Sequence, residues 1–452
     1  MSDQPPREPD ATPSDVGRRG FFRHLGRNAV RAAGNAAGTV DVVRRGSVAA
    51  AGGLLGFGLD TAGTVHQDRA AAIRPPGPPR IDDAEAHRQG TTLDFRSPYR
   101  LDGDTLVILD QRRLPYELVD VACIDGHAVA RAIRDGAIRG APVLAQVAAY
   151  GLFLTARSVR ARSADERDAA IQAAAAALLA ARPSARPLAY AVERMLARWW
   201  AFPRRPAPAD PAEMLRAEPA AMRAEADAIA SESQLDHPKL ARWAAASITV
   251  PEGRPAGLLV HGNAGALAGG MFGTALGAVQ RLVADGRDVH VWATESRPSQ
   301  DGARLTTTEL EWMDTPFTLI ADAAAGQVLA SGKVDAVLLG AEHIARNGDT
   351  AGTVGSFPIA AAAATLGIPV LICAASCTIA LGTSGGAAIP ADRDPSGRPL
   401  LDVTPASLIT ALFTEHGRIE PSSEAQLRAA YERAALRRMP HGRSSTPEAV
   451  AG

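Results

Sequence analysis

An arginine, two small residues and a proline stand together in Arg139-Gly140-Ala141-Pro142. Small side chains leave backbone N–H groups accessible, and proline suits the first turn of a helix. A helix N-terminus attracts anions, and a guanidinium adds a planar pair of hydrogen-bond donors. The pattern therefore predicts a phosphate site at the start of a helix. The alternative is a plain helix start with a surface arginine.

Polar or glycine-rich turns also follow short apolar runs later in the chain. Leu258-Leu259-Val260 leads into His261-Gly262-Asn263-Ala264-Gly265, and residues 334–339 lead into Gly340-Ala341-Glu342. Further apolar runs, at 289–293, 317–320 and 370–373, alternate with helix-length segments. This alternation predicts βαβ units in a parallel sheet, whose ligands bind beyond the carboxyl ends of the strands. We therefore expect the turns after these runs to face one ligand.

The preceding part of the chain has a different pattern. A β-like run at 105–109 is followed by helical spacing at 129–138 and 143–156, and residues 164–250 are dominated by Ala, Arg, Leu and Glu. These features favour helices, which Pro183, Pro187, Pro203, Pro206 and Pro208 should interrupt. The expected fold class is α/β. A mainly helical N-terminal domain with short strands (91–250) precedes a Rossmann-like parallel-sheet C-terminal domain (251–440) and a disordered tail (441–452).

Residues 1–90 are expected to form an Arg-rich, partly disordered leader and linker. Its first 16 residues are rich in Pro, Asp and Ser, and Arg18-Arg19 stands shortly before a small-residue apolar stretch at 47–58. One hypothesis is a twin-arginine export signal, and the other is an amphipathic helix lying on the protein, a partner or a membrane surface. We favour the helix because Asp41, Arg44 and Arg45 separate the paired arginines from the apolar stretch.

Composition excludes several classes of function. Lys and Arg number 48 against 49 Asp and Glu, so no positive field is available to hold nucleic acid. No apolar run reaches the ~20 residues that span a bilayer. The 3 cysteines, Cys123, Cys373 and Cys377, indicate a reducing, cytoplasmic compartment rather than a disulfide framework. No His/Cys/carboxylate cluster has ligand spacing, so we expect neither metal nor cofactor.

Several motifs occur in a fixed order along the chain. They are Asp110-Gln111-Arg112-Arg113-Leu114-Pro115, Arg139-Gly140-Ala141-Pro142, Leu259-Val260-His261-Gly262-Asn263-Ala264-Gly265-Ala266-Leu267, Thr294-Glu295-Ser296-Arg297-Pro298, Gly302-Ala303-Arg304-Leu305-Thr306, Gly340-Ala341-Glu342, Asn347-Gly348-Asp349-Thr350 and Asp402-Val403-Thr404-Pro405. Together they resemble the methylthioribose-1-phosphate isomerase family, over about residues 101–419. That family shares its fold with ribose-1,5-bisphosphate isomerases and the regulatory subunits of initiation factor 2B.

The resemblance implies an aldose–ketose isomerase that acts on a pentose 1-phosphate and forms a homodimer. It places substrate-binding residues at Arg139, Gly140, Ala141, Arg182, Asn263, Asp301, Asp349, Gly352 and Thr353. The catalytic positions that it implies are Gly262 and Glu342, with His261 beside them. The reaction moves a carbonyl from C1 to C2, which requires an acid to open the sugar ring and a group to manage the hydrogen at C2.

This sequence departs from the family's pattern at the positions that the resemblance assigns to catalysis and substrate binding. The family's cysteine is Gly262 here, its aspartate is Glu342, its Asn-Lys pair is Gly352-Thr353, and a common glutamine is Asp301. Two functions therefore remain open. The first is an isomerase with Glu342 as acid/base, and the second is a non-catalytic, initiation-factor-2B-like protein that senses a sugar phosphate or nucleotide. His261 or Cys377 could supply a missing base, although either could equally be structural.

Overall fold

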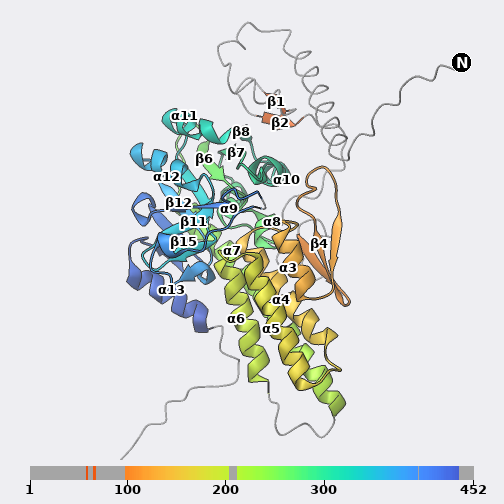
Figure 1. Ribbon diagram of the computed structural model, residues 1–452. Helices are drawn as coiled ribbons and strands as arrows, with labels where there is room; N and C mark the ends of the chain where they lie inside the picture. The colour runs from red at the N-terminus through yellow and green to blue at the C-terminus, as the bar shows by residue number, and fades with distance from the viewer. Residues whose placement is uncertain (1–56, 60–64, 68–96, 203–210, 395, 437–452) are drawn as a thin grey trace, which may run out of the picture.

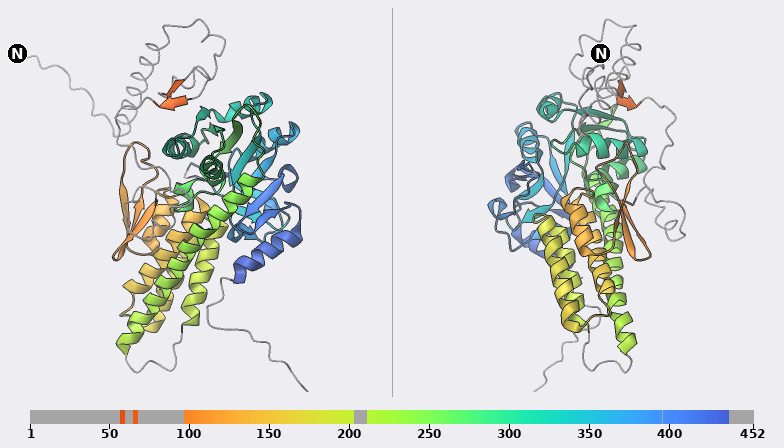
Figure 2. Two further views of the ribbon diagram at one scale, coloured as in Figure 1. Left: turned by 180° about the vertical axis from the view of Figure 1, so that it is seen from behind. Right: turned by 45° about the vertical axis from the view of Figure 1, so that its right-hand side comes forward.

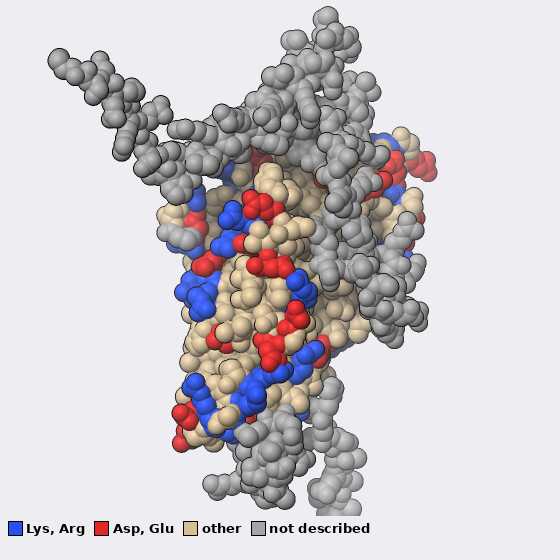
Figure 3. All heavy atoms as spheres, turned by 90° about the vertical axis from the view of Figure 1, so that its right-hand side faces the viewer, with Lys and Arg blue, Asp and Glu red and all other residues tan. Residues whose placement is uncertain are grey.

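The computed structural model describes residues 57–59, 65–67, 97–202, 211–394 and 396–436, and a helical bundle projects from a strand-rich body (Figure 1). The rest of the proposed leader and tail lies outside these residues, as do Pro203, Pro206 and Pro208. Among the helices described, none has the length and apolarity required to cross a membrane. On the face that Figure 3 shows, acidic and basic side chains are interspersed, in keeping with the formal net charge of -1.

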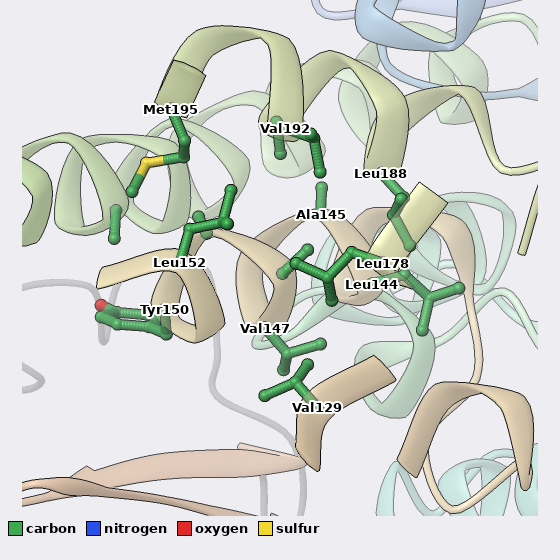
Figure 4. Packing of buried hydrophobic residues seen from close by; sticks show 14 of the residues in the cluster. Val129, Leu144, Ala145, Val147, Tyr150, Leu152, Leu178, Leu188, Val192 and Met195 are labelled. Carbon is green, nitrogen blue, oxygen red and sulfur yellow. The ribbon is translucent and has the colours of Figure 1, made fainter. Parts of the chain in front are cut away.

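The bundle has α4 at its centre. It contains α3 (Gly126–Arg134), α4 (Ala141–Ser158), α5 (Ala164–Ala181), α6 (Arg186–Ala201) and α7 (Pro211–Ala246). Side chains from α4, including Leu144, Val147 and Leu152, meet apolar side chains of the neighbouring helices (Figure 4). Because α4 is buried on all sides from Ala141 to Ala156 with few gaps, its sequence is apolar throughout rather than amphipathic.

Proline positions explain most of the breaks between these helices. Pro183 lies between α5 and α6, and Pro187 lies in the first turn of α6, where no backbone N–H is needed. In contrast, Pro219 and Pro238 lie inside α7, so this helix continues through two residues that normally interrupt one. Beside the bundle, β3 (Tyr99–Asp102), β4 (Thr105–Leu109) and β5 (Asp120–Cys123) form an antiparallel sheet.

A nine-stranded sheet forms the second part, in the order β1-β2-β8-β7-β6-β9-β12-β15-β16. Its strands are β1 (Phe57–Leu59), β2 (Val65–Gln67), β6 (Ala256–His261), β7 (Val289–Thr294), β8 (Phe317–Ile320), β9 (Ala336–Gly340), β12 (Val370–Cys373), β15 (Ala411–Thr414) and β16 (Gly417–Ile419). From β8 to β15 all neighbours are parallel. Strands occur at every predicted apolar run, and the mixed α/β class is confirmed.

The remaining elements surround this sheet. The helices are α8 (Ala266–Gly269), α9 (Ala275–Ala284), α10 (Thr307–Trp312), α11 (Ala325–Ala330), α12 (Ser356–Thr365) and α13 (Glu424–Leu436), with a π-helical turn at Gly302–Thr306. A smaller sheet combines β10 (His343–Ala345), β11 (Thr350–Thr353), β13 (Ile379–Ala380) and β14 (Leu401–Thr404). The sequence analysis did not predict this sheet, because its strands are only two to four residues long.

Strand β6 marks the point where the strand order reverses. It pairs with β7 on one side and with β9 on the other, with His261 opposite Leu339. In open parallel sheets a ligand crevice forms at such a point, beyond the carboxyl ends of the strands. Both faces of β6 are covered, since Leu258 packs in one apolar cluster and Leu259 in another. Helix α7 extends from the bundle onto this sheet, as both views in Figure 2 show, and contacts α4 and α9.

Replacing Gly257 by Ala should destabilise the sheet. Gly257 lies in β6, and a Cβ there would fall 1.7 Å from the backbone oxygen of Lys333. We expect Gly257→Ala to lower the free energy of unfolding by about 2–4 kcal/mol, because backbone must move. Gly326→Ala is the matched control: its Cβ would meet nothing within 4 Å on α11, so it should stabilise by roughly 0.5–1 kcal/mol. Equal stability of the two variants in chemical denaturation would contradict the argument.

Candidate functional site

Two adjoining pockets form a cleft between the start of α4 and the carboxyl ends of β6 and β9. Of the sequence-predicted site residues, the cleft is lined by Arg139, Gly140, Ala141, Arg182, His261, Asn263, Asp301, Glu342, Gly352 and Thr353. Turns far apart in the sequence therefore meet at the reversal of strand order, as a parallel sheet requires. Neither Gly262 nor Asp349 is among the lining residues.

The start of α4 can approach the sheet only because residue 140 is glycine. Gly140 has φ +105°, and a Cβ there would lie 2.4 Å from the Cβ of Ala268 on α8. No described side chain caps α4, and proline stands in its first turn. The first N–H groups of the helix therefore remain available to an anionic ligand, as the sequence pattern predicts.

Arg139 is paired with a carboxylate at the edge of this cleft. Its Nη1 donates to Oδ2 of Asp301 at 2.8 Å, and its backbone N–H donates to Oε1 of Gln111 at 3.0 Å. The other carboxylate oxygen of Asp301 accepts from Nη2 of Arg304 at 3.2 Å. Sequence reasoning proposed both Arg139 and Asp301 as ligand contacts but did not foresee that they contact each other.

Arg182 and Glu342 form a second ion pair. Nη2 of Arg182 donates to Oε1 of Glu342 at 2.8 Å, and Nε donates to Oε2 at 3.2 Å. Asp392 lies 3.0 Å from the same Nε, and the hydroxyl of Ser184 lies within hydrogen-bond distance of both carboxylates, nearer to Asp392. Burial opposes the charge of Arg182, but Glu342 and Asp392 raise its pKa above the ordinary value. Burial also raises the pKa of Asp392.

Sequence reasoning did not identify Asp392 or Ser184. Asp392 lies outside regular secondary structure, where no periodic pattern marks it, and its contact with Ser184 spans 208 residues. Ser184 lies two residues after Arg182, so adjacency to Arg182 was the only signal that could have found it.

Gly262 lies behind the cleft, and Thr353 occupies the space in front of it. Gly262 has φ +77°, and a Cβ there would fall 2.7 Å from Oγ1 of Thr353. Its N–H donates to Ser296 Oγ at 2.8 Å, and its carbonyl accepts from Thr306 Oγ1 at 2.7 Å. The backbone at 262 is thus fixed on both sides. A residue larger than glycine would push against Thr353.

Both ring nitrogens of His261 are engaged within the protein. Nε2 lies 2.9 Å from the carbonyl of Val354 and must carry the proton, while Nδ1 accepts from the hydroxyl of Thr294 at 2.7 Å. Burial lowers the pKa of His261, which keeps the ring neutral. The geometry favours a positioning role, since neither nitrogen is left to take a substrate proton.

Asp349 and Cys377 do not reach the cleft. The Asp349 carboxylate accepts from the backbone N–H groups of Gly386 and Ala406, both at 3.0 Å, and from Asn347. These hydrogen bonds lower its pKa despite partial burial. Asp349 therefore fixes the loops beside β11 and β14 rather than lining the site. Cys377 is half-buried and is likewise absent from the lining.

Glu309 is a buried residue that supports the cleft and that sequence reasoning missed. Glu309 of α10 accepts from the backbone N–H groups of Ala266 and Leu267 and from Nδ2 of Asn263 at 3.2 Å. It thereby caps α8 and orients Asn263, which lines the cleft. Burial raises the pKa of Glu309 to about 7, although these hydrogen bonds act in the opposite direction.

Comparisons with known proteins agree on one family. The model of the "Initiation factor 2 subunit family" matches residues 137–421. The methylthioribose-1-phosphate isomerase of Pelotomaculum thermopropionicum is 40% identical over 352 residues, which cover 74% of this chain and 93% of that protein. The protein of the same name from Chloroflexus aurantiacus is 38% identical over 345 residues, covering 72% and 96%.

Solved structures give the same result. The 5-methylthioribose 1-phosphate isomerase of Pyrococcus horikoshii OT3 superposes with a TM-score of 0.64 at 28% identity, covering 74% of this chain and 96% of that one. The delta subunit of translation initiation factor eIF-2B from A. fulgidus superposes with a TM-score of 0.60 at 29% identity, covering 74% and 99%.

Glu309 should make stability depend on pH. Its folded-state pKa of about 7 lies above the ordinary value of 4.5, so between these values the folded state holds a proton that the unfolded state has lost. Stability should therefore fall as pH rises through this interval. We expect Glu309→Gln to gain about 2–3 kcal/mol relative to the original protein between pH 5 and pH 8 in urea denaturation. If the difference in stability between the two proteins stays constant from pH 5 to pH 8, Glu309 titrates normally.

Introducing a cysteine at position 262 should be costly unless Thr353 is also changed. We expect Gly262→Cys to destabilise the protein by about 2–4 kcal/mol, from the positive φ and from the overlap with Thr353. In a Thr353→Gly background the overlap disappears, so the cost of Gly262→Cys should shrink by roughly 1–2 kcal/mol. Thermal unfolding of the four proteins measures this coupling. Equal costs in both backgrounds would disprove it.

Proposed function

The chain belongs to the initiation factor 2 subunit family, and from that premise we propose that it is an aldose–ketose isomerase for a pentose 1-phosphate of the methylthioribose type. The observation that carries this proposal is the cleft itself. Arg139, Arg182 and the uncapped start of α4 converge on it, and the carboxylate of Glu342 lies within it. The cations and the helix N-terminus suit a phosphate, and the carboxylate can handle the hydrogen at C2.

The phosphate would bind at the start of α4. Gly140, which precedes the uncapped first turn of α4, lines the same part of the cleft as Arg139 and Arg182, so backbone N–H groups and guanidinium groups can share an anion there. The other part of the cleft offers hydroxyl and small apolar groups from Thr274, Ser356 and Ala374 rather than further arginines. It suits the sugar and an uncharged substituent.

Glu342 is the group proposed to handle the proton at C2. Its carboxylate is held by Arg182. A phosphate that recruits Arg182 would weaken this pair and release the carboxylate towards the sugar. General acid–base catalysis by a positioned carboxyl group contributes about 100- to 10,000-fold to rate. The hydroxyl of Thr353 and the amide of Asn263 line the same space and can bond the sugar oxygens.

One observation favours a second candidate, a non-catalytic sensing or regulatory role. At position 262 a side chain is absent and Thr353 fills its space, so no acid stands there to open the ring. The likeness to the eIF-2B delta subunit supports this alternative. Such a protein would bind the sugar phosphate without converting it.

Two broader features are part of the proposal. The bundle and the parallel sheet would be separate domains, of residues 91–250 and 251–440, with the sheet domain forming a homodimer. A cytoplasmic location is supported by the three cysteines, none of which forms a disulfide.

Turnover tests the two candidates. We expect the purified protein to convert methylthioribose 1-phosphate to its ketose, followed by NMR, and Glu342→Gln to lower kcat by about 100-fold or more while binding persists. Ribose 1,5-bisphosphate serves as the second substrate. Glu424→Gln is the matched control, since Glu424 is an exposed ion-pair partner of Arg428.

The outcomes separate the candidates. Binding without conversion would favour the sensing role, and full activity in Glu342→Gln would exclude this residue as the acid/base. No binding of either compound would remove both candidates.

A further inference from the structure

Asp301 stands where a ligand anion would otherwise meet Arg139. Its Oδ2 accepts from Nη1 of Arg139 at 2.8 Å. The exposed fraction of the side chain is 11% for Asp301 and 26% for Arg139. Both Asp301 and Arg139 line the same part of the cleft as Gly140, at the start of α4. The guanidinium that should grip a phosphate is therefore already bound to a carboxylate.

We propose that Asp301 is an intramolecular counter-ion that competes with the ligand's phosphate for Arg139 and so sets the affinity of the cleft for anions. This inference rests on the proposed anion site at α4. It gives Asp301, which the sequence resemblance placed among the substrate-binding residues, an opposing effect on the binding of phosphate. Asp301 is a specificity-determining residue in this proposal rather than a catalytic one.

Asp301 cannot easily swing out of the cleft, because Arg304 holds it from behind. Nη2 of Arg304 donates to Oδ1 of Asp301 at 3.2 Å. Arg304 itself is fixed by two backbone carbonyls, since its Nη1 donates to Gln111 at 2.8 Å and to Leu114 at 3.1 Å. A phosphate that displaces Asp301 from Arg139 therefore still has a carboxylate beside it, and like charges in a partly buried cleft repel.

The neighbouring ion pair has the same character. Arg182 is bound by Glu342 and Asp392, so the three arginines at 139, 182 and 304 face three carboxylates at 301, 342 and 392. Among the described residues of this cluster, positive and negative charges balance. The cleft thus has donors arranged for an anion but little net attraction for one, and removing one carboxylate should strengthen binding rather than weaken it.

Calorimetric titration with inorganic phosphate and with methylthioribose 1-phosphate tests the proposal. Asp301→Asn keeps the shape and removes the charge, and we expect it to bind both anions about 10- to 100-fold more tightly than the original protein. In an Arg139→Gln background the gain from Asp301→Asn should shrink, because the guanidinium of Arg139 is no longer there to be released and only the repulsion by Asp301 is removed. Asp285→Asn is the matched control, since it also removes the charge of a carboxylate that pairs with an arginine, in this case Arg281 on the surface.

A gain in affinity is not what loss of a structural contact would produce. Melting temperatures verify that each variant folds, and Asp301→Gln provides a second neutral replacement. Unchanged or weaker binding in both Asp301 variants would overturn the proposal, even if the original protein converts its substrate. Tighter phosphate binding in Asp301→Asn would support it, even if no sugar phosphate is ever converted. Absence of binding by every variant would overturn both this inference and the proposed function.

Discussion

The close approach of α4 to the carboxyl ends of β6 and β9 is the constraint on which the cleft depends. It requires glycine at position 140, where a Cβ would fall 2.4 Å from Ala268. Glu309 reinforces it from the other side by capping α8, the short helix that Gly140 contacts. A helix start with unsatisfied N–H groups is thereby placed against the point where the strand order reverses, and two general preferences for ligand binding coincide.

The main feature of the cleft is the pairing of its charged side chains rather than its shape. The arginines expected to bind phosphate are bound instead by Asp301, Glu342 and Asp392. Ion pairs of this kind satisfy the guanidinium groups in the absence of ligand, because a partly buried cation left without a partner is unfavourable. An anion that enters the cleft must also replace a carboxylate that the arginine already contacts. The net gain in binding free energy is therefore smaller than the number of arginines suggests.

The position behind the cleft illustrates how one residue restricts another. With glycine at 262 and φ at +77°, the hydroxyl of Thr353 occupies the volume that a larger side chain at 262 would need. His261, the residue before Gly262, has both ring nitrogens bonded within the protein, to Thr294 and to Val354. Glu342 is the carboxylate that lines both parts of the cleft, which supports the proposal that it handles the proton.

The sequence by itself determined the α/β class, the parallel strands β6, β7, β8, β9 and β12 and the turns at their ends, because these follow from local apolar periodicity and turn residues. The parallel strand β15 was not predicted. The sequence also indicated Arg139 and Arg182 as cations near the ligand. Only the tertiary structure decided their partners: Asp301 is 162 residues from Arg139, and Glu342 is 160 from Arg182. It likewise removed Asp349 from the cleft, and it showed Asp392 and Glu309 as partners of the cleft residues Arg182 and Asn263. Pairings at that separation depend on how helices and strands pack, which no local pattern of residues records.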